Sequence, residues 1–343
     1  MRFDRVLVTG GAGFIAWHLI EELKRQNSNI RIVSLDTMVP KRACASVEYV
    51  IHDVRRLYHS AVDERCDVLF NLAAVHRTPG HPDHEYFETN VAGATNAVRY
   101  CDRHSIKTMV FTSSISVYGP SESPLDEKSP PNPNHAYGRS KWLAEEIHRA
   151  WVERAPDNRL VVVRPAIVFG EGENGNYTRL IRLLNRGTFA FPGRTDTRKA
   201  GFYVKELVRS IGFALDKANP SYLYNFAYPE CPTIKEICKI LRDVAQLRAP
   251  LGTIPLLPME LAAIPFEILN TIGVRNAINR DRIRKLIHST YVLPRQLMDD
   301  RYRFSYSYAT AFADWLGDDG DLGVRLRPDA KLEVLAPAQT VSD

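Results

Sequence analysis

The sequence predicts an α/β protein with a doubly wound parallel sheet and a smaller, mostly helical lobe in its C-terminal half. Short runs rich in valine, isoleucine and leucine recur over residues 1–170, namely RVLVTG, IRIVSLD, VLFNLAA, KTMVFTSS and RLVVVRP. Strands that are apolar throughout belong in a sheet covered on both faces. Their alternation with longer amphipathic segments indicates parallel strands joined by crossover helices.

The chain is expected to divide near residue 170. Residues 1–170 are predicted to form the sheet domain, with helices at 16–26, 85–104 and 137–154. Residues 171–320 are predicted to form a substrate-binding lobe, some later segments returning to the sheet domain, and residues 327–343 a flexible tail. Because ligands of such sheets bind beyond the carboxyl ends of the strands, the cleft between the two parts is the predicted site.

Composition narrows the class of protein. The 343 residues are 45% hydrophobic and 25% charged, which is ordinary for a globular protein and unlike a disordered chain. The net charge of +5 is spread along the chain rather than gathered into basic runs, so no nucleic-acid partner is expected. Five cysteines without a CxxC pair, in a chain with no recognisable secretory leader, favour reduced thiols and a cytoplasmic location.

The most apolar late stretch is IPLLPMELAAIPFEIL, residues 254–269. Three prolines and two glutamates interrupt it, which disfavours a membrane-spanning helix. We expect a packed helix or a cap over a pocket, and no membrane partner.

A glycine-rich loop follows the first predicted strand directly and precedes the first predicted helix. In VTGGAGFIA, Gly11, Gly13 and Ala16 match the pattern G-x-G-x-x-G/A, and Gly10 adds a G-x-x-G-x-x-A match. Glycines at these places allow a tight turn and let a pyrophosphate approach the helix N-terminus closely. The loop therefore predicts a Rossmann-type domain that binds a dinucleotide.

The end of the second predicted strand indicates which dinucleotide is bound. Asp36 lies twenty residues beyond Ala16, where a carboxylate can bind both ribose hydroxyls and repel a 2′-phosphate, so NAD is favoured over NADP. Lys41 and Arg42 weaken this exclusion of NADP a little. Asp53, in HDV after the third strand, is a candidate partner for the adenine edge.

Three further residues predict alcohol-to-ketone chemistry. Tyr137 and Lys141 are four residues apart at the start of a helix, so both face the same way. An ammonium beside a phenol favours the phenolate, which is a usable base near neutral pH. Ser114, at the end of the apolar run FTSS, can bind the same substrate oxygen while a hydride moves to or from the nicotinamide.

His76, His81 and His84 lie in the loop VHRTPGHPDHEY. Their spacing fits no zinc pattern, and this chemistry needs no metal. We interpret them as ordinary loop residues and expect no metal site.

The ordered motifs resemble the extended short-chain dehydrogenase/reductases, specifically the NAD-dependent sugar epimerase/dehydratase family. The similarity covers residues 6–170 through VTGGAGFIA, HDV, NLAA, TNVAGATNAV, TSSISVYG, YGRSK and RPAIVFG, and continues more weakly to about residue 317. The resemblance implies Tyr137 as acid/base, Lys141 on the nicotinamide ribose, and Ser114 as the hydroxyl partner. It also implies a homodimer paired through helices 85–104 and 137–154.

The same resemblance implies a set of NAD contacts. They are Gly10, Gly13, Phe14 and Ile15 at the pyrophosphate, Asp36 at the adenosine ribose, Asp53 and Val54 at the adenine, Leu72, Ala73 and Ala74 along the dinucleotide, and Arg164 and Pro165 at the start of the loop beneath the nicotinamide. Asn90 is expected to support the strand that bears Ser114.

The residues after Ser114 depart from one branch of the family. Sugar-nucleotide 4,6-dehydratases carry Asp-Glu there, and related decarboxylases use a glutamate at the second place, whereas this chain has Ile115 and Ser116. Neither side chain can act as the acid or base that elimination requires. Dehydration is therefore disfavoured, and hydride transfer without elimination is expected.

Substrate contacts are expected mainly in the second lobe. Basic residues cluster in NYTRLIRLLNRGTFAFPGRTDTRK, and guanidinium groups can clamp a diphosphate. The candidates for contact with sugar or phosphate are Ser116, Asn176, Arg179, Arg198 and Lys199. Relatives commonly have an arginine beside an acid here, but Ala200 replaces the acid, and Arg198 and Lys199 compete for the role.

Three hypotheses follow. The first is an NAD-dependent C4 epimerase of a UDP-, GDP- or dTDP-linked sugar. The second is a one-way reductase or dehydrogenase of a sugar nucleotide or an apolar alcohol. The third is a non-catalytic NAD-sensing or scaffold protein, which the complete set of Ser114, Tyr137 and Lys141 disfavours.

Overall fold

Seven parallel strands form the central sheet of the computed structural model, which describes residues 3–78, 80–271, 280–318 and 320–328. The strand order is β11-β7-β5-β4-β1-β2-β3. The strands are β1 (Arg5–Thr9), β2 (Arg31–Asp36), β3 (Val47–Ile51), β4 (Val68–Asn71), β5 (Thr108–Thr112), β7 (Arg159–Pro165) and β11 (Ser221–Phe226). The predicted doubly wound parallel sheet is confirmed, and the late strand β11 joins it beside β7.

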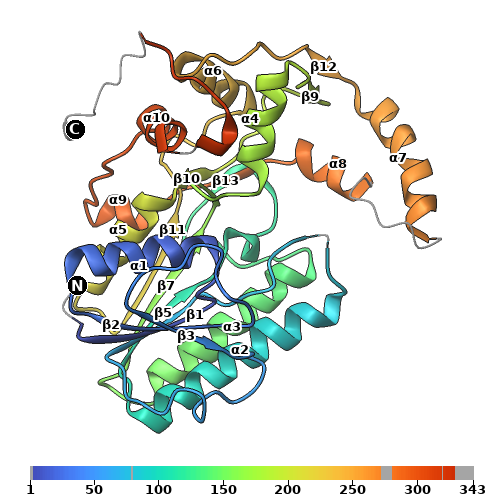
Figure 1. Cartoon of the computed structure of the whole chain (residues 1–343). Helices are drawn as coiled ribbons and strands as arrows, with labels where there is room; N and C mark the ends of the chain where they lie inside the picture. Colours follow the sequence, from blue (N-terminus) through green and yellow to red (C-terminus); the bar gives the residue numbers. More distant parts are fainter. Residues whose placement is uncertain (1–2, 79, 272–279, 319, 329–343) are drawn as a thin grey trace.

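Helices cover both faces of the sheet (Figure 1). α1 (Phe14–Gln26) and α5 (Val204–Leu215) lie on one face, and α2 (Asp83–His104) and α3 (Ala136–Glu153) on the other. Val6 and Val8 of β1 pack toward the first pair, while the intervening Leu7 packs toward the second. Apolar side chains on both faces explain why these strands read as continuous apolar runs.

Two of these helices begin two residues earlier than predicted. α1 begins at Phe14 because Gly13 is its N-cap, and α2 begins at Asp83 because Pro82 is its N-cap. Phe14 and Ile15 therefore belong to the first turn of α1.

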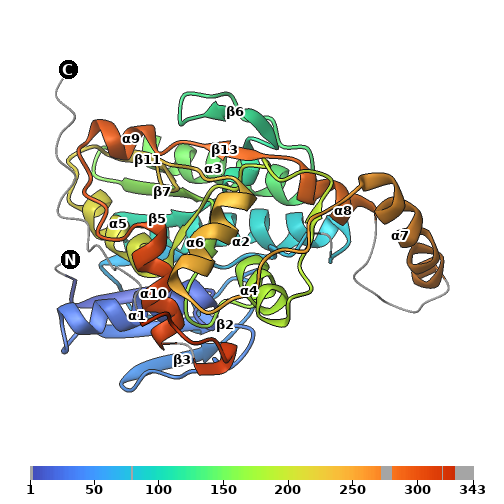
Figure 2. The ribbon, with the colours of Figure 1, turned by 90° about the horizontal axis from the view of Figure 1, so that it is seen from above.

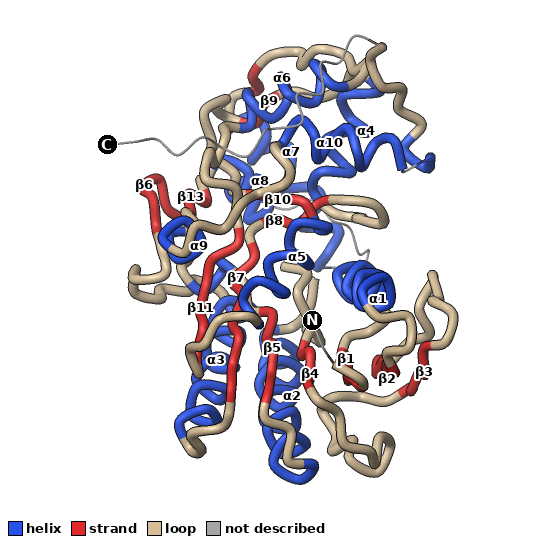
Figure 3. Tube along the Cα trace, turned by 90° about the vertical axis from the view of Figure 1, so that its left-hand side faces the viewer, coloured by secondary structure: helices blue, strands red, loops and turns tan. Residues whose placement is uncertain are grey.

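The second lobe stands above the carboxyl ends of the strands (Figure 3). It contains α4 (Asn176–Arg186), α6 (Ile234–Val244), α10 (Tyr308–Asp318) and the short strands β8 (Ile167–Phe169), β9 (Phe191–Pro192), β10 (Gly201–Tyr203) and β12 (Thr253–Ile254). Aromatic rings gather around Phe169, including Tyr177, Tyr203, Tyr308, Phe312 and Trp315. Smaller elements join the parts: η1 (Ile115–Val117), the parallel pair β6 (Ser121–Leu125) and β13 (Thr290–Val292), α9 (Arg295–Asp299) and η2 (Gly320–Leu322).

The apolar late stretch forms α7 (Leu256–Thr271), followed by α8 (Arg280–Ile287), and both project from the lobe (Figure 2). The expectation of a packed helix is wrong for most of α7, because Leu257 and Leu261 are exposed and Ala263 is the only fully buried side chain among those described in this helix. Among the described residues, no helix has both the length and the apolar character needed to cross a membrane. Of the predicted tail, the Arg327 amide bonds to the Val244 carbonyl, and residues 329–343 lie outside the described residues.

Candidate active site

The glycine-rich loop runs closely between the ends of β2 and β4. Gly10 has φ +74°, and a Cβ there would lie 2.6 Å from the backbone nitrogen of Ala73. At Gly11 a Cβ would collide with the Ser34 hydroxyl of β2. Glycine is needed at both places. At Gly10 the positive φ and the close backbone of Ala73 exclude a side chain, and at Gly11 the close Ser34 side chain excludes one.

The N-terminus of α1 opens directly from this loop. Its N-cap, Gly13, provides no side-chain hydrogen bond, and no acidic residue occupies the first turn. The backbone N–H groups that begin with Phe14 and Ile15 therefore have no side-chain cap from Gly13, as a helix that binds a pyrophosphate requires.

Asp36 lies at the end of β2, beside the loop. Its Oδ2 accepts a hydrogen bond from the Ala12 amide at 3.0 Å, and its Oδ1 accepts one from the Met38 amide at 3.2 Å. Arg42, which was expected to weaken the exclusion of NADP a little, pairs with Glu171 at 2.5 Å and lies over the Trp17 ring. The carboxylate of Asp36 is thus oriented by backbone amides.

Asp53 and Val54 follow β3. The Asp53 carboxylate accepts hydrogen bonds from the backbone amide and the Nε of Arg55, at 2.9 and 2.8 Å, and Arg55 lowers the pKa of Asp53. Val54 is buried beside Gly93 of α2. Asp53 therefore forms a turn with Arg55. The predicted contact with adenine would use the same carboxylate that already binds Arg55.

Asn90 has a different use from the expected one. Its amide group bonds to the backbone of Val75 in both directions, at 2.9 and 3.2 Å, and donates to the Ser140 hydroxyl at 2.8 Å. Asn90 thus ties the loop after β4 to α3, rather than supporting the strand that bears Ser114. That loop carries Leu72, Ala73 and Ala74 past Gly10, with the Leu72 amide bonded to the Thr9 carbonyl.

The structure brings Ser114 and Tyr137 together. The Ser114 hydroxyl accepts the Ser116 amide at 3.1 Å and so caps η1. Burial raises the pKa of Tyr137, and a side-chain hydrogen bond with Ser114 partly offsets this effect. The ring of His135, the N-cap of α3, stacks on Tyr137 with centroids 6.1 Å apart.

Lys141 lies one turn further along α3. The residue is 1% exposed, and its ammonium group lies 4.3 Å from the centroid of the Phe111 ring. Burial lowers the pKa of Lys141 to about 7, and the negative charge of Glu145 partly opposes this shift. The charge of Lys141 is therefore poised near neutral pH.

A buried network beneath Lys141 was not predicted from the sequence. Arg164 binds both carboxylate oxygens of Glu145, at 2.9 and 2.6 Å, and donates to the Tyr118 hydroxyl at 2.6 Å. The Ser113 hydroxyl also donates to Glu145, and Tyr118 donates to Asn225 at 2.8 Å. The guanidinium of Arg164 thus serves this network, and Arg164 and Pro165 are the last two residues of β7.

The sequence did carry a signal for this network. Tyr137, Lys141 and Glu145 follow one another at intervals of four residues along α3. Such residues share one helix face. A carboxylate buried on that face needs a cationic partner, and Arg164 is that partner of Glu145.

The substrate candidates of the second lobe are dispersed. Asn176 and Arg179 lie on the exposed face of α4. Arg198 donates to the Cys231 carbonyl at 2.8 Å and lies over Tyr291. The Lys199 ammonium donates to the carbonyls of Lys285 and His288, at 2.9 and 2.6 Å, and burial lowers its pKa to about 8. Both cations at the contested position are therefore already engaged.

Ile115 and Ser116 stand at the two positions after Ser114, where dehydratases were expected to carry an acid pair. Ile115 is buried in the core beside the site, while Ser116 is half-buried, with its carbonyl against Gly138 of α3. Neither position offers an acid or a base for elimination.

Comparison with known proteins identifies the family. The model of the NAD dependent epimerase/dehydratase family matches residues 6–227. The chain belongs to this family. It is 30% identical over 293 residues to the N-acetyl-alpha-D-glucosaminyl-diphospho-ditrans,octacis-undecaprenol 4-epimerase of Escherichia coli O157:H7, covering 84% of this chain and 86% of that protein.

Two further likenesses are shorter or more distant. The chain is 28% identical over 179 residues to the UDP-glucose 4-epimerase of Lactobacillus helveticus, covering 50% of this chain and 54% of that enzyme. The solved structure of MoeE5 in complex with UDP-glucuronic acid and NAD has a TM-score of 0.72 at 22% identity, covering 91% of this chain and 98% of that one. This last likeness supports the fold.

The family is NAD dependent, and the residues of this chain fit NAD. The close approach at Gly10, the absent side-chain cap of α1 and the oriented carboxylate of Asp36 form the cradle that a pyrophosphate and an unphosphorylated ribose require. The chain is thus an NAD-dependent enzyme of the extended short-chain dehydrogenase/reductase type.

The loop histidines form no cluster. His81 pairs with Glu85 at 2.7 Å. In the part of the chain that the structure describes, no three side chains of His, Cys, Asp or Glu converge as metal ligands.

Proposed function

We propose that the protein is an NAD-dependent 4-epimerase of a sugar that carries a diphosphate at its anomeric carbon. The observation that carries this proposal is the Ser114–Tyr137 pair beside buried Lys141, without an acid at residues 115 and 116. The relatives from Escherichia coli and Lactobacillus helveticus are both named as 4-epimerases, and the sugar of each is attached to a diphosphate.

The roles of the chain's own residues follow from their positions. Gly10, Gly13, Phe14, Ile15 and Asp36 would hold NAD, which when bound supplies a hydride acceptor that can return the hydride to the same carbon. Tyr137 takes the proton of the C4 hydroxyl and gives it back after the ketone has turned.

Tyr137 depends on neighbouring side chains to form a phenolate. Because burial raises the pKa of the Tyr137 phenol, phenolate formation needs help from the Ser114 hydroxyl and the Lys141 ammonium. Lys141 would also hold the nicotinamide ribose. Ile115 and Ser116 leave no group to remove a second proton and expel water, so the ketone is reduced again rather than dehydrated.

The finer assignments stay predictions. The sugar is predicted to be linked to UDP, GDP or dTDP. A polyprenyl diphosphate is a second candidate, because the Escherichia coli relative is named for a sugar linked to such a group. The substrate contacts predicted from the sequence are Ser116, Asn176, Arg179, Arg198 and Lys199, and among them we expect Lys199, whose ammonium binds two backbone carbonyls, to have a structural role instead. A homodimer through α2 and α3 and a cytoplasmic location likewise stay predictions.

The test combines cofactor analysis with turnover. The purified protein is denatured, released dinucleotide is identified, and untreated protein is assayed without added cofactor on UDP-glucose, UDP-N-acetylglucosamine, their GDP and dTDP counterparts, and a polyprenyl-diphosphate N-acetylglucosamine. We expect one NAD per chain and reversible inversion at C4, with deuterium at C4 retained in the product. Activity that demands added NADH or NADPH, with net reduction, would establish the one-way reductase instead.

A further inference from the structure

α7 and α8 form a two-helix arm, residues 256–271 and 280–287, that projects from the second lobe (Figure 1). Two ion pairs join the helices, Glu260 with Arg284 at 2.7 Å and Glu267 with Arg280 at 2.9 Å. The polar groups of α7 are therefore spent on the face that meets α8.

One side of α7 is apolar and exposed. Leu257, Leu261 and Ile264 are 67%, 57% and 37% exposed, and Leu286 of α8 is 49% exposed. The three residues of α7 are spaced i, i+4, i+7, so they form one stripe along the helix. An apolar helix face of this kind normally lies against a partner.

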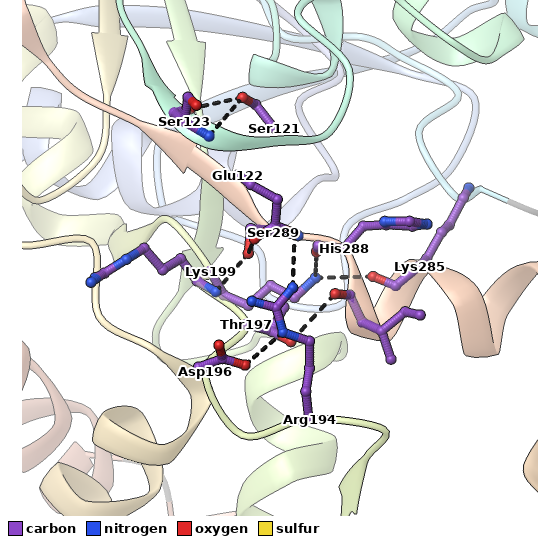
Figure 4. A network of polar contacts seen from close by, with 12 residues as sticks. Ser121, Glu122, Ser123, Arg194, Asp196, Thr197, Lys199, Lys285, His288 and Ser289 are labelled. Carbon is purple, nitrogen blue, oxygen red and sulfur yellow. Dashed lines mark hydrogen bonds and ion pairs between the residues drawn. The ribbon is translucent and has the colours of Figure 1, made fainter. Parts of the chain in front are cut away.

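The root of the arm adjoins the active site. Lys199 binds the carbonyls of Lys285 and His288 at the end of α8, and the Ser289 amide and hydroxyl donate to Glu122 at 3.1 and 2.8 Å (Figure 4). Burial and the positive charge of Lys285 both lower the pKa of His135, whose ring stacks on Tyr137. The arm is thus fixed at its root to Lys199 and to Glu122 of β6, and the charge of Lys285 acts on His135 at the start of α3.

Basic groups accompany the apolar stripe. Arg280, Arg284 and Lys285 of α8 are all exposed, and Arg280 and Arg284 pair with Glu267 and Glu260 of α7. A short apolar helix flanked by exposed arginine and lysine complements an anionic lipid surface, where the apolar face enters the acyl boundary and the cations meet phosphates.

We propose that the arm docks its apolar stripe on an anionic membrane surface and so places the active site at sugar diphosphates carried by a lipid. The lipid-borne substrate rests on the proposed 4-epimerase function. The prolines and glutamates that disfavour a membrane span do not disfavour a helix lying at the interface. The Escherichia coli relative, which matches 84% of this chain, acts on a sugar linked to undecaprenyl diphosphate.

The test uses the full chain and sedimenting vesicles of phosphatidylglycerol mixed with phosphatidylethanolamine. We expect the wild-type protein to bind, and the combined change Leu257→Glu, Leu261→Glu and Ile264→Glu to lower the partition coefficient by about 100-fold. Vesicles of phosphatidylcholine alone should bind the wild-type protein more weakly. The control, Leu57→Glu with Leu183→Glu, changes exposed leucines elsewhere and should bind vesicles like the wild type.

Three outcomes would overturn the proposal. They are wild-type protein that stays in solution, a triple variant that binds as well as wild type, and a triple variant whose oligomeric mass in lipid-free buffer falls, which would assign the stripe to a second copy of the chain. Turnover of a water-soluble UDP-sugar without vesicles should be the same in the triple variant and the wild type. Vesicle binding without any epimerisation would instead contradict the proposed function.

Discussion

The two walls of the site are built in different ways. On the sheet side, Tyr137, Lys141 and Glu145 lie on one face of a single regular helix. On the lobe side, the basic candidates come from loops and an exposed helix face, and Arg198 and Lys199 bind backbone carbonyls. The comparison indicates that helix geometry fixes the wall of the proposed catalytic residues, whereas the wall of the proposed substrate contacts depends on which charges the lobe leaves available.

The largest effect is expected at the catalytic wall. Tyr137→Phe removes the proton donor and acceptor but keeps the ring that packs near Tyr86 and His135. We expect turnover on the epimerisable sugar to fall by about 1,000-fold, a normal loss for a general acid/base. Bound NAD, measured after denaturation, should stay at the wild-type level, and turnover within a few fold of wild type would refute the role of Tyr137.

Glu145→Gln tests the support beneath that wall. The change leaves the buried Arg164 guanidinium without its carboxylate, so the free energy of unfolding should fall by about 3–5 kcal/mol. Denaturant titration measures the loss. The matched control is Glu146→Gln, whose carboxylate pairs with Arg149 near the surface and should cost less than about 0.5 kcal/mol. Equal effects at both positions would show that the buried pair has no special weight.

What the sequence predicted follows the same division. The sheet, the glycine loop and the Tyr137–Lys141 spacing depend on local periodicity, which is readable along the chain. The Arg164–Glu145 pair joins residues 19 positions apart, and the Lys199 contacts with α8 join residues more than 80 apart. Such pairings join segments that only the folded chain brings together, so local periodicity does not identify the partner residue.

The exposure of α7 shows a second limit. Its composition indicated a packed helix or a cap, and composition alone does not say whether the apolar face meets the same molecule or another partner. The glutamates that interrupt the run, Glu260 and Glu267, acquire meaning only when α8 brings Arg284 and Arg280 opposite them.

The pH dependence of stability tests the buried Lys141. Its pKa is about 7 in the folded protein and near 10.5 when exposed, so between these values the unfolded chain holds a proton that the folded chain has released. Stability of the NAD-free protein should therefore rise with pH, by about 2 kcal/mol between pH 7 and pH 9 from this group.

The measurement is a difference between two proteins. Lys141→Met should lose this part of the slope, while the similar contribution of Lys199 remains in both proteins and cancels. Identical slopes in denaturant titrations at pH 7, 8 and 9 would show that Lys141 keeps its ordinary pKa.

The smallest effect is expected at Lys199, where a substitution tests whether this cation of the lobe has a structural or a substrate-binding role. Lys199→Met removes an ammonium that binds two carbonyls at the end of α8, so we expect a loss of about 1 kcal/mol in the free energy of unfolding. Because its donors face those carbonyls, the KM for the sugar diphosphate should stay within twofold of wild type. Lys239→Met, on the exposed face of α6, is the control and should change neither quantity. A KM raised tenfold or more, with little loss of stability, would instead make Lys199 the diphosphate ligand and place the substrate wall at the root of the arm.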